Sequence, residues 1–352
     1  MVFHGHLLKP SNQRKGKKMN RKQHIFYAIV LTLIVIFMTS CSTIPEQRII
    51  SLSPSHTEVL YALGLEDQIV GWTKYCNYPP EVQETGGWLP YDEYEFKSIH
   101  DELYNKDVAV VSAFTKVNYE LIDSLKPTLI LAVHKMQHDI TQKLRDKGYN
   151  VLYFEPQTLE DVFKLIQGVG DAAGKTNRAK KLIAGYRYEI DEIKYITAKI
   201  PKAKVYFEIN HVGPWVLGAG SPMDQILEIA GGENIFNDVQ SEAFKAELVD
   251  IVERNPDVIM TPLWPHAGRN EVTTVREIMN RPGFEMINAV INDRVYHYDS
   301  SLLKKPGPRQ ITAIKKMAYL LHPYYFENPK NSVDPWELGK IDALYSPPTV
   351  PR

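Results

Sequence analysis

Cysteine is scarce in this chain, and neither sign of charge is in large excess. The 352 residues include only Cys41 and Cys76, which cannot build a disulfide framework or a cysteine-based metal site. Residues 1–40 contain seven Lys or Arg and no acid, so the remainder has 34 basic against 42 acidic residues. A remainder of net charge −8 offers no basic surface to nucleic acid. We therefore exclude zinc fingers and DNA binding.

Catalytic motifs are also missing. The sequence has no serine in a nucleophile elbow and no His-Glu-x-x-His motif. Residues 168–176 are similar to a P-loop, but Val169 stands where the first glycine should be, and we expect a corner between two helices there. His134 and His138 are four residues apart, yet no acidic partner motif lies near them, so they predict no dedicated metal site. We expect no enzyme, no catalytic residue and no cofactor.

A short apolar segment follows the basic amino terminus. Residues 25–37 form a run of 13 mostly apolar residues, whereas a membrane-spanning helix needs about 20, so the run suits the core of a signal peptide. The run leads into Met-Thr-Ser-Cys at Cys41, which resembles the lipobox of bacterial lipoproteins and implies acylation of that cysteine. A plain signal peptide or an uncleaved short anchor remains the alternative. Translation starts at Met1 or Met19.

The rest of the chain alternates strand patterns with helix patterns, which predicts mostly parallel sheets covered by helices. The strand-like runs are residues 48–52, 69–72, 108–111, 128–133 and 150–154 in a first series, and 204–209, 258–261 and 295–298 in a second. Length also favours two domains. We expect an α/β fold with two Rossmann-like lobes.

Between the two series, residues 159–200 contain almost no strand signal. Residues 175–199 have no proline and one glycine, enough for about 37 Å of helix. One long, rigid helix is therefore predicted to join the lobes. The predicted parts are a signal peptide (1–40), a tether (41–47), an N-terminal lobe (48–157), a helical linker (158–202), a C-terminal lobe (203–322) and a proline-rich tail (323–352).

Aromatic residues are concentrated between positions 75 and 104. Seven aromatics occur within these 30 residues, among Pro, Gly, Asn and Asp, including Tyr75, Trp88 and Tyr91. Aromatic side chains on rigid loops favour a large, flat or amphipathic ligand. A tightly packed loop cap is the alternative interpretation.

Several motifs together resemble the corrinoid-binding proteins of ATP-driven importers, within the superfamily of siderophore, haem and corrinoid binders. The matching segments are residues 48–58 (RIISLSPSHTE), 62–65, 75–80 (YCNYPP), 111–115, 228–236 (EIAGGENIF), 281–283 and 306–309 (PGPR). The resemblance covers roughly residues 48–322. It implies two lobes with a ligand cleft between them, a rigid linker helix, and delivery of the ligand to a permease and its ATPase.

The resemblance also implies which side chains contact the ligand. The matched or neighbouring positions are Tyr75, Trp88, Phe114, His134, Trp215 and Phe244. Trp88 lies in a stretch, residues 81–107, that looks inserted relative to the family, and His134 could contact the ligand's own metal. Val133 departs from the family pattern, which has tryptophan there.

Family members dock on the permease through one acidic residue in each lobe. Glu120 matches in the first lobe, seven residues before Pro127. In the second lobe that spacing reaches Val249, and Asp250 matches only if one residue is missing after it, with Glu247 as the other candidate. A solvated carboxylate at a helix start is the alternative for either acid.

The expected protein is therefore a monomeric lipoprotein outside the cytoplasm, anchored on the periplasmic side or at the cell surface. It would bind cobalamin or cobinamide and pass it to an importer. A ferric siderophore or haem is the alternative ligand.

Overall fold

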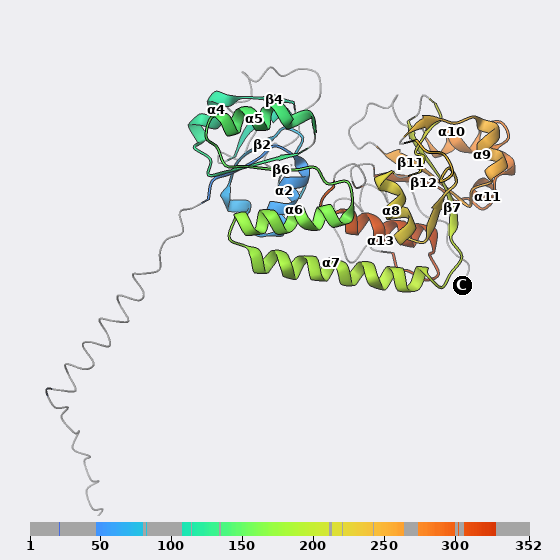
Figure 1. The fold of residues 1–352 in the computed structure, drawn as a ribbon. Helices are drawn as coiled ribbons and strands as arrows, with labels where there is room; N and C mark the ends of the chain where they lie inside the picture. The colour runs from blue at the N-terminus through green and yellow to red at the C-terminus, as the bar shows by residue number, and fades with distance from the viewer. Residues whose placement is uncertain are drawn as a thin grey trace, which may run out of the picture. The chain divides into compact units, whose positions relative to one another are not determined.

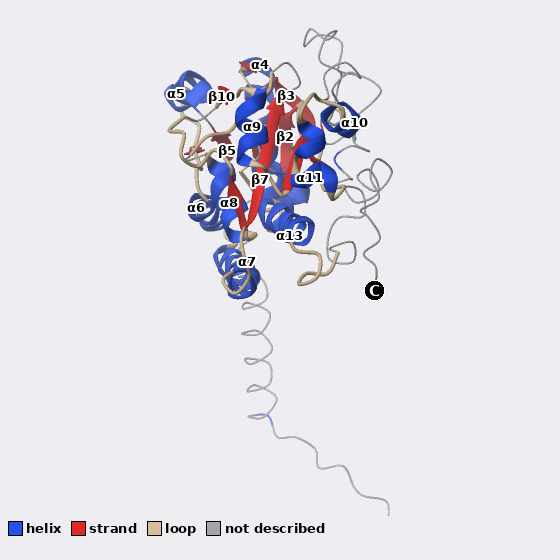
Figure 2. Ribbon diagram, turned by 90° about the vertical axis from the view of Figure 1, so that its right-hand side faces the viewer, coloured by secondary structure: helices blue, strands red, loops and turns tan. Residues whose placement is uncertain are grey.

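Two sheets, each of six strands, form the centre of the structure. The computed structural model describes residue 21 and residues 47–79, 82, 108–113, 115–133, 135–210, 213–219, 221–241, 243–263, 274–299, 302 and 306–328. Residues 47–352 belong to one compact unit. Figure 1 shows the order of the elements along the chain, and Figure 2 shows helices on both sides of the strands.

The first sheet has the strand order β4-β3-β2-β1-β5-β6. All neighbouring strands run parallel except β3 and β4. The strands are β1 (Ile49–Ser51), β2 (Ile69–Thr73), β3 (Ala109–Ala113), β4 (Lys116–Val117), β5 (Leu129–Val133) and β6 (Val151–Phe154). The connecting helices are α2 (Pro54–Ala62), η1 (Glu66–Gln68), α4 (Tyr119–Leu125), η2 (Lys135–Gln137) and α5 (His138–Asp146). We call this part the first lobe.

The second sheet has the order β10-β8-β7-β11-β12, and β9 pairs with the first half of β7. Its strands are β7 (Ala203–Asn210), β8 (Trp215–Val216), β9 (Gly232–Asn234), β10 (Phe244–Lys245), β11 (Val258–Leu263) and β12 (Val295–Asp299). Its helices are α8 (Pro222–Ile229), α9 (Leu248–Arg254), α10 (Val275–Met279), η3 (Phe284–Met286), α11 (Asn288–Ile291) and α13 (Gln310–Leu321). We call this part the second lobe.

The α/β prediction is confirmed, and its physical basis is visible in the central strands. All five residues of β5, with the sequence LILAV, are buried. A parallel strand is covered on both faces by helices, so it reads as a continuous apolar run rather than an alternating one.

The segment between the sheets contains two helices, α6 (Leu159–Ala172) and α7 (Thr176–Thr197). The long helix predicted over residues 175–199 corresponds to α7, and α6 is the helix before the corner predicted at residues 168–176. Helix α6 begins with a capping box in which Thr158 and Asp161 satisfy each other's backbone amides. Gly174 between the helices has a φ of +69°, so the P-loop-like segment is a corner between helices, as predicted. At 22 residues, α7 is about 33 Å long.

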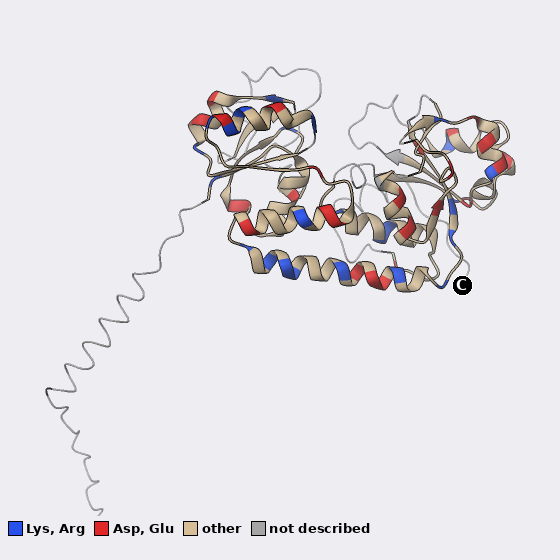
Figure 3. Ribbon diagram, viewed as in Figure 1, with Lys and Arg blue, Asp and Glu red and all other residues tan. Residues whose placement is uncertain are grey.

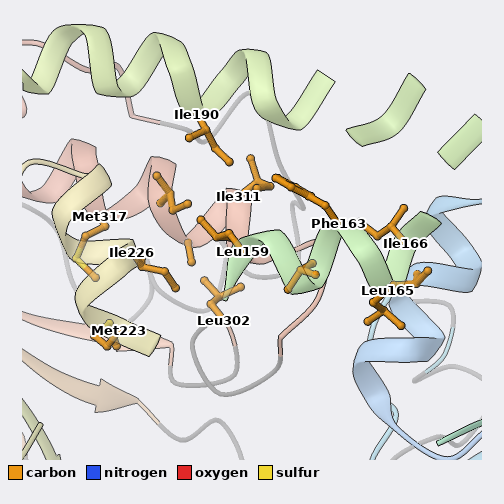
Figure 4. Close-up of a cluster of buried hydrophobic side chains, with 14 of the residues drawn as sticks. Leu159, Phe163, Leu165, Ile166, Ile190, Met223, Ile226, Leu302, Ile311 and Met317 are labelled. Carbon is orange, nitrogen blue, oxygen red and sulfur yellow. The ribbon is translucent and has the colours of Figure 1, made fainter. Parts of the chain in front are cut away.

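The apolar core runs without interruption from the first lobe through the linker into the second. One cluster of buried side chains includes residues of β1, α2, α6, α7, β7, α8 and α13. In Figure 4, Leu159 and Phe163 of α6 lie close to Ile311 of α13, and Ile311 lies beside Ile190 of α7. Since these helices share one core, moving one lobe against the other requires repacking of buried side chains.

Candidate ligand-binding site

In a fold of this topology, the carboxyl ends of the strands are the usual place for a ligand. In the first sheet, β1 lies between β2 and β5, so the chain order reverses at β1. In open α/β sheets, ligands bind outside the carboxyl ends of the strands at such a reversal. The side chains that follow β1, β2 and β5 are therefore the first to consider.

Gln137 joins the carboxyl ends of β1 and β5. Its side chain is fully buried. The side-chain Nε2 donates to the carbonyl oxygen of Leu52 at 2.9 Å, and the backbone amide of Val133 donates to its Oε1 at 2.9 Å. This glutamine fixes the spacing of the two strands at the reversal.

Tyr75 is placed by the turn that follows β2. It is half-buried, and the Nζ atom of Lys74 lies 5.3 Å from the centre of its ring. Of the other ligand residues predicted for the first lobe, Trp88, Phe114 and His134 lie outside the described residues. His138, four residues after His134, is exposed. Its ring lies edge-to-face with that of Tyr153, with 6.3 Å between the ring centroids.

In the second lobe, β8 and β10 form an antiparallel ribbon at the carboxyl end of β7. The register pairs Trp215 with Lys245 and Val216 with Phe244. Because paired residues share a face and successive residues alternate, Trp215 and Phe244 lie on opposite faces of the ribbon. Phe244 packs edge-to-face on Phe236 with 5.3 Å between ring centroids, whereas Trp215 is 40% exposed. The ribbon therefore presents Trp215 and Lys245 together, and Phe244 packs into the lobe.

A buried ion pair, Glu58 with Arg309, joins α2 of the first lobe to the start of α13. An Arg309 guanidinium nitrogen donates to Oε1 of Glu58 at 2.7 Å, and the two side chains are 4% or less exposed. The guanidinium carbon also lies 4.3 Å from the centre of the Tyr78 ring. Both charged residues stand in the quoted motifs, but nothing in their spacing indicates that they pair.

A second buried ion pair, Glu208 with Arg281, supports the ribbon through β7. Arg281 donates to both carboxylate oxygens of Glu208, at 2.5 and 2.9 Å, and the Tyr206 hydroxyl donates to the same carboxylate at 2.7 Å. Burial and the Glu208 charge raise the pKa of Tyr206 well above its usual value. Since Glu208 is the strand partner of Val216, this cluster holds the ribbon that carries Trp215.

A cavity of about 680 Å³ lies beside α2, α7 and the start of α13. Of the predicted ligand residues that the structure describes, Tyr75, Trp215 and Phe244, none lines it. Its charged groups are largely paired already: Glu58 with Arg309, and Glu189 with Lys315. Burial, with the nearby charges of Glu189 and Glu58, raises the pKa of Tyr186 in its wall to about 12. We place the ligand at the strand ends rather than in this cavity.

Helices α4 and α9, which contain the acids predicted for docking, have the same construction. Each has seven residues, and each ends at a residue in the left-handed conformation, Lys126 (φ 48°) or Asn255 (φ 46°). Each buries one isoleucine at its fourth position, Ile122 or Ile251. The two helices can therefore be aligned residue by residue.

This alignment places Val249 at the position of Glu120, because both are the second residue of their helix. Asp250 lies one residue further along, and Glu247 is the cap before the helix. All four side chains are exposed. Both helices have seven residues before the left-handed cap, so α9 has no missing residue after Asp250.

Metal ligation and membrane crossing have no support in the described part of the chain. It contains no group of three or more His, Cys, Asp or Glu that could hold a metal ion. Within the same residues, none of the helices combines the length and the apolar character of a membrane span.

A two-lobed α/β fold with a helical linker is characteristic of solute-binding proteins that serve importers. The chain belongs to the family described as periplasmic binding protein, whose sequence profile matches residues 49–302. Members of this family act outside the cytoplasm, bind solutes rather than catalyse reactions, and work with an ABC transporter permease and its ATPase. This chain is accordingly an ABC transporter substrate-binding protein of the siderophore, haem and vitamin B12 group.

Relatives agree with this assignment. The chain is 28% identical, over 80% of its length and 82% of the relative's, to the uncharacterized ABC transporter substrate-binding lipoprotein YvrC of Bacillus subtilis. It is 24% identical to the vitamin B12-binding protein of Vibrio vulnificus, over 81% and 94% of the two chains.

Solved structures show the same fold. A possible iron-binding (periplasmic solute-binding) protein from Staphylococcus epidermidis matches with a TM-score of 0.63 at 26% identity, over 78% of this chain and 98% of that one. The periplasmic haem-binding protein RhuT of Roseiflexus matches with a TM-score of 0.62 at 22% identity, over 79% and 98%.

Proposed function

We propose that this protein captures a corrinoid, cobalamin or cobinamide, and delivers it to its importer. The observation that carries the proposal is Trp215, a large aromatic side chain that stays 40% exposed on a ribbon held at the carboxyl end of β7. Tyr75 offers a second aromatic ring at the carboxyl end of β2. Flat apolar faces of this kind suit a corrin ring. The similarity to vitamin B12-binding proteins over most of both chains supports the same ligand.

A second candidate, haem or a ferric siderophore, is favoured by two lysines. Lys245 is the cross-strand neighbour of Trp215, and Lys74 lies over the ring of Tyr75. Cations beside aromatic rings suit a ligand that carries carboxylate or other anionic groups as well as a flat surface. Cobinamide, which lacks a phosphate, would make less use of these lysines than haem would.

The visible absorption spectrum decides between the ligands. The purified protein is incubated with cyanocobalamin, dicyanocobinamide, haemin or a ferric catecholate siderophore and then desalted. We expect a corrinoid spectrum to remain with the protein at a stoichiometry near one. Retention of haemin or siderophore in place of both corrinoids would favour the second candidate.

Trp215→Ala tests the site itself. Loss of one aromatic contact at a buried ligand surface costs about 2 kcal/mol or more, which corresponds to at least about thirtyfold in affinity. Calorimetry should show this loss for Trp215→Ala, while Tyr188→Ala, which removes a more exposed ring on α7, should bind like the unmodified chain. Unchanged affinity in a folded Trp215→Ala protein would contradict the proposed site.

We further propose that Cys41 is the acylated first residue of the mature protein. The motif at Cys41 supports this proposal, and YvrC, a relative, is described as a lipoprotein. In cells given labelled palmitate, the unmodified chain should take up label, and Cys41→Ala should remain as an unlabelled precursor or leave the membrane. Cys76→Ala is the control, since that thiol is buried. Absence of label from the unmodified chain would sink the proposal.

A further inference from the structure

The charges of α7 are segregated along its axis. The first twelve residues contain Arg178, Lys180, Lys181 and Arg187 and no acid, whereas the acids of the helix all lie after them. Figure 3 shows the basic residues at the end of α7 that is nearer to the first lobe. The positive end of the helix dipole disfavours cations in this half. Helix stability alone therefore does not account for the arrangement.

Only part of this positive charge is used inside the protein. Arg187 pairs with Glu160 of α6 at 2.6 Å, and Nε of Arg178 donates to the Ala62 carbonyl at 3.3 Å. Lys180 and Lys181 are exposed. Hydrogen bonds from Thr176 and Gln167, and then the nearby charge of Lys180, lower the pKa of Asp171 at the end of α6. Among the ion pairs of the described residues, α7 contributes Arg187 and Glu189 but neither lysine, so both ammonium groups can meet a negatively charged surface.

Exposed tyrosines continue the same face. Tyr188 and Tyr195 follow Lys181 at intervals of seven residues, so the three side chains lie on one side of the helix. The tyrosines are 63% and 66% exposed. Tyrosine has an apolar ring and a polar tip, and it is enriched where protein meets the headgroup region of a bilayer.

The proposed lipid anchor leaves the folded unit beside this helix. The side-chain Nε2 of Gln47 donates to the carbonyl oxygen of Ala172 at 3.2 Å. Ala172 is the last residue of α6, and α7 begins at Thr176. Cys41 is six residues before Gln47, and six residues span at most about 20 Å. An acylated Cys41 therefore keeps the first turns of α7 close to the bilayer.

We propose that the amino-terminal half of α7, through Lys180, Lys181 and Tyr188, rests on the anionic headgroup surface of the membrane that holds the anchor. This inference depends on the proposed acylation of Cys41. Each lysine near an anionic surface strengthens binding by about fivefold, and the short tether raises the effective concentration of the surface to the millimolar range or above. A contact that would be weak between separate molecules is then well populated.

The test uses the full, acylated chain in vesicles of phosphatidylcholine with or without phosphatidylglycerol. A fluorophore is attached to Ala184→Cys, an exposed position between Lys181 and Tyr188, while Cys76 is fully buried and does not react. A spin label on the lipid headgroups quenches a fluorophore that touches the surface. We expect strong quenching in the anionic vesicles, at least about fivefold less in neutral ones, and loss of quenching near 1 M salt, where the Debye length is about 3 Å.

Charge-reversed variants separate the surface contact from mere tethering. Lys180→Glu with Lys181→Glu should remove the quenching, whereas Lys116→Glu with Lys143→Glu, the same charge change on β4 and α5, should keep it. Equal quenching in neutral and anionic vesicles, or in the Lys180/Lys181 variant, would overturn the inference. Flotation with the vesicles is measured in parallel. Failure of the unmodified chain to float would instead overturn the anchor itself, so the two failures are distinguishable.

Discussion

His56 is fully buried on α2, with its ring edge toward the ring of Phe154 at 6.4 Å between centroids. Neither ring nitrogen makes a hydrogen bond of normal geometry. Burial lowers the pKa of His56 to about 4, and a weak interaction with the backbone of Leu131 offsets part of that effect. A neutral imidazole is thus enclosed directly beneath the strand ends that we assign to the ligand.

The buried His56 predicts acid sensitivity. In the unfolded chain its pKa is near 6.5, so between about pH 6.5 and 4 the unfolded state holds a proton that the folded state does not. The free energy of unfolding should therefore fall as the pH drops through this window, by about 3 kcal/mol in total. Urea unfolding at several pH values should show this fall in the unmodified chain and in His138→Leu, whose imidazole is exposed. An equal fall in His56→Leu would show that other groups cause it.

At the scale of single residues, candidate ligand side chains could be named from the sequence more readily than the contacts between side chains. Trp215 could be named because an aromatic in a matched motif is a recognisable ligand residue. Gln137 could not, since a single glutamine after a strand carries no pattern, although its two hydrogen bonds join β1 and β5. Phe244 was named with Trp215, but the ribbon register that separates their faces cannot be read from spacing.

Among the elements, α4 and α9 are fixed at their carboxyl ends by ion pairs. Asp123 of α4 accepts from Lys147 at 2.8 Å and from the Tyr149 hydroxyl at 2.5 Å. Arg254 of α9 donates to both carboxylate oxygens of Asp238, at 2.7 and 2.9 Å. With their last turns held in this way, both helices have their first turns at a defined position.

The docking prediction follows from these helices. Glu120 is exposed in the first turn of α4, so Glu120→Ala should leave ligand affinity in solution unchanged and should lower permease association and uptake. In α9 the equivalent position is apolar, so Asp250→Ala should have a smaller effect than Glu120→Ala, and Val249→Glu should strengthen association. Calorimetry and pull-down with the permease measure the two quantities. Loss of ligand binding in Glu120→Ala with intact association would reverse the assignment.

Element predictions succeeded where a segment was long enough to show a period. The strand β5 was predicted from the run at residues 128–133, and the helix α7 from residues 175–199. The ribbon strands β8 and β10 have two residues each, too few to show an alternation. They form because β7 extends beyond β9 and offers backbone groups that need partners.

For the whole molecule, loss of one partner of the Glu58–Arg309 ion pair should strongly lower the free energy of unfolding. Arg309→Met leaves the carboxylate of Glu58 buried without its partner, which typically costs about 3–5 kcal/mol. Arg187→Met, which breaks the exposed pair with Glu160, should cost below about 1 kcal/mol. Urea unfolding of both variants measures the difference.

A double variant separates charge from shape. Glu58→Leu with Arg309→Met replaces both charges by apolar groups, so it should recover most of the stability that Arg309→Met loses. If Arg309→Met unfolds no more easily than Arg187→Met, or if the double variant is the least stable of all, the buried pair does not have the proposed role.

The same ion pair sets an order of events in the folding of the newly made chain. Glu58 and Arg309 are 251 residues apart, and Glu58 is made and exported first. Until Arg309 has followed, its carboxylate has no counter-charge, and α2 cannot close against α13. The first lobe therefore cannot complete its packing until nearly the whole chain is present. A chain cut short before residue 309 should keep Glu58 without its counter-charge and remain incompletely packed.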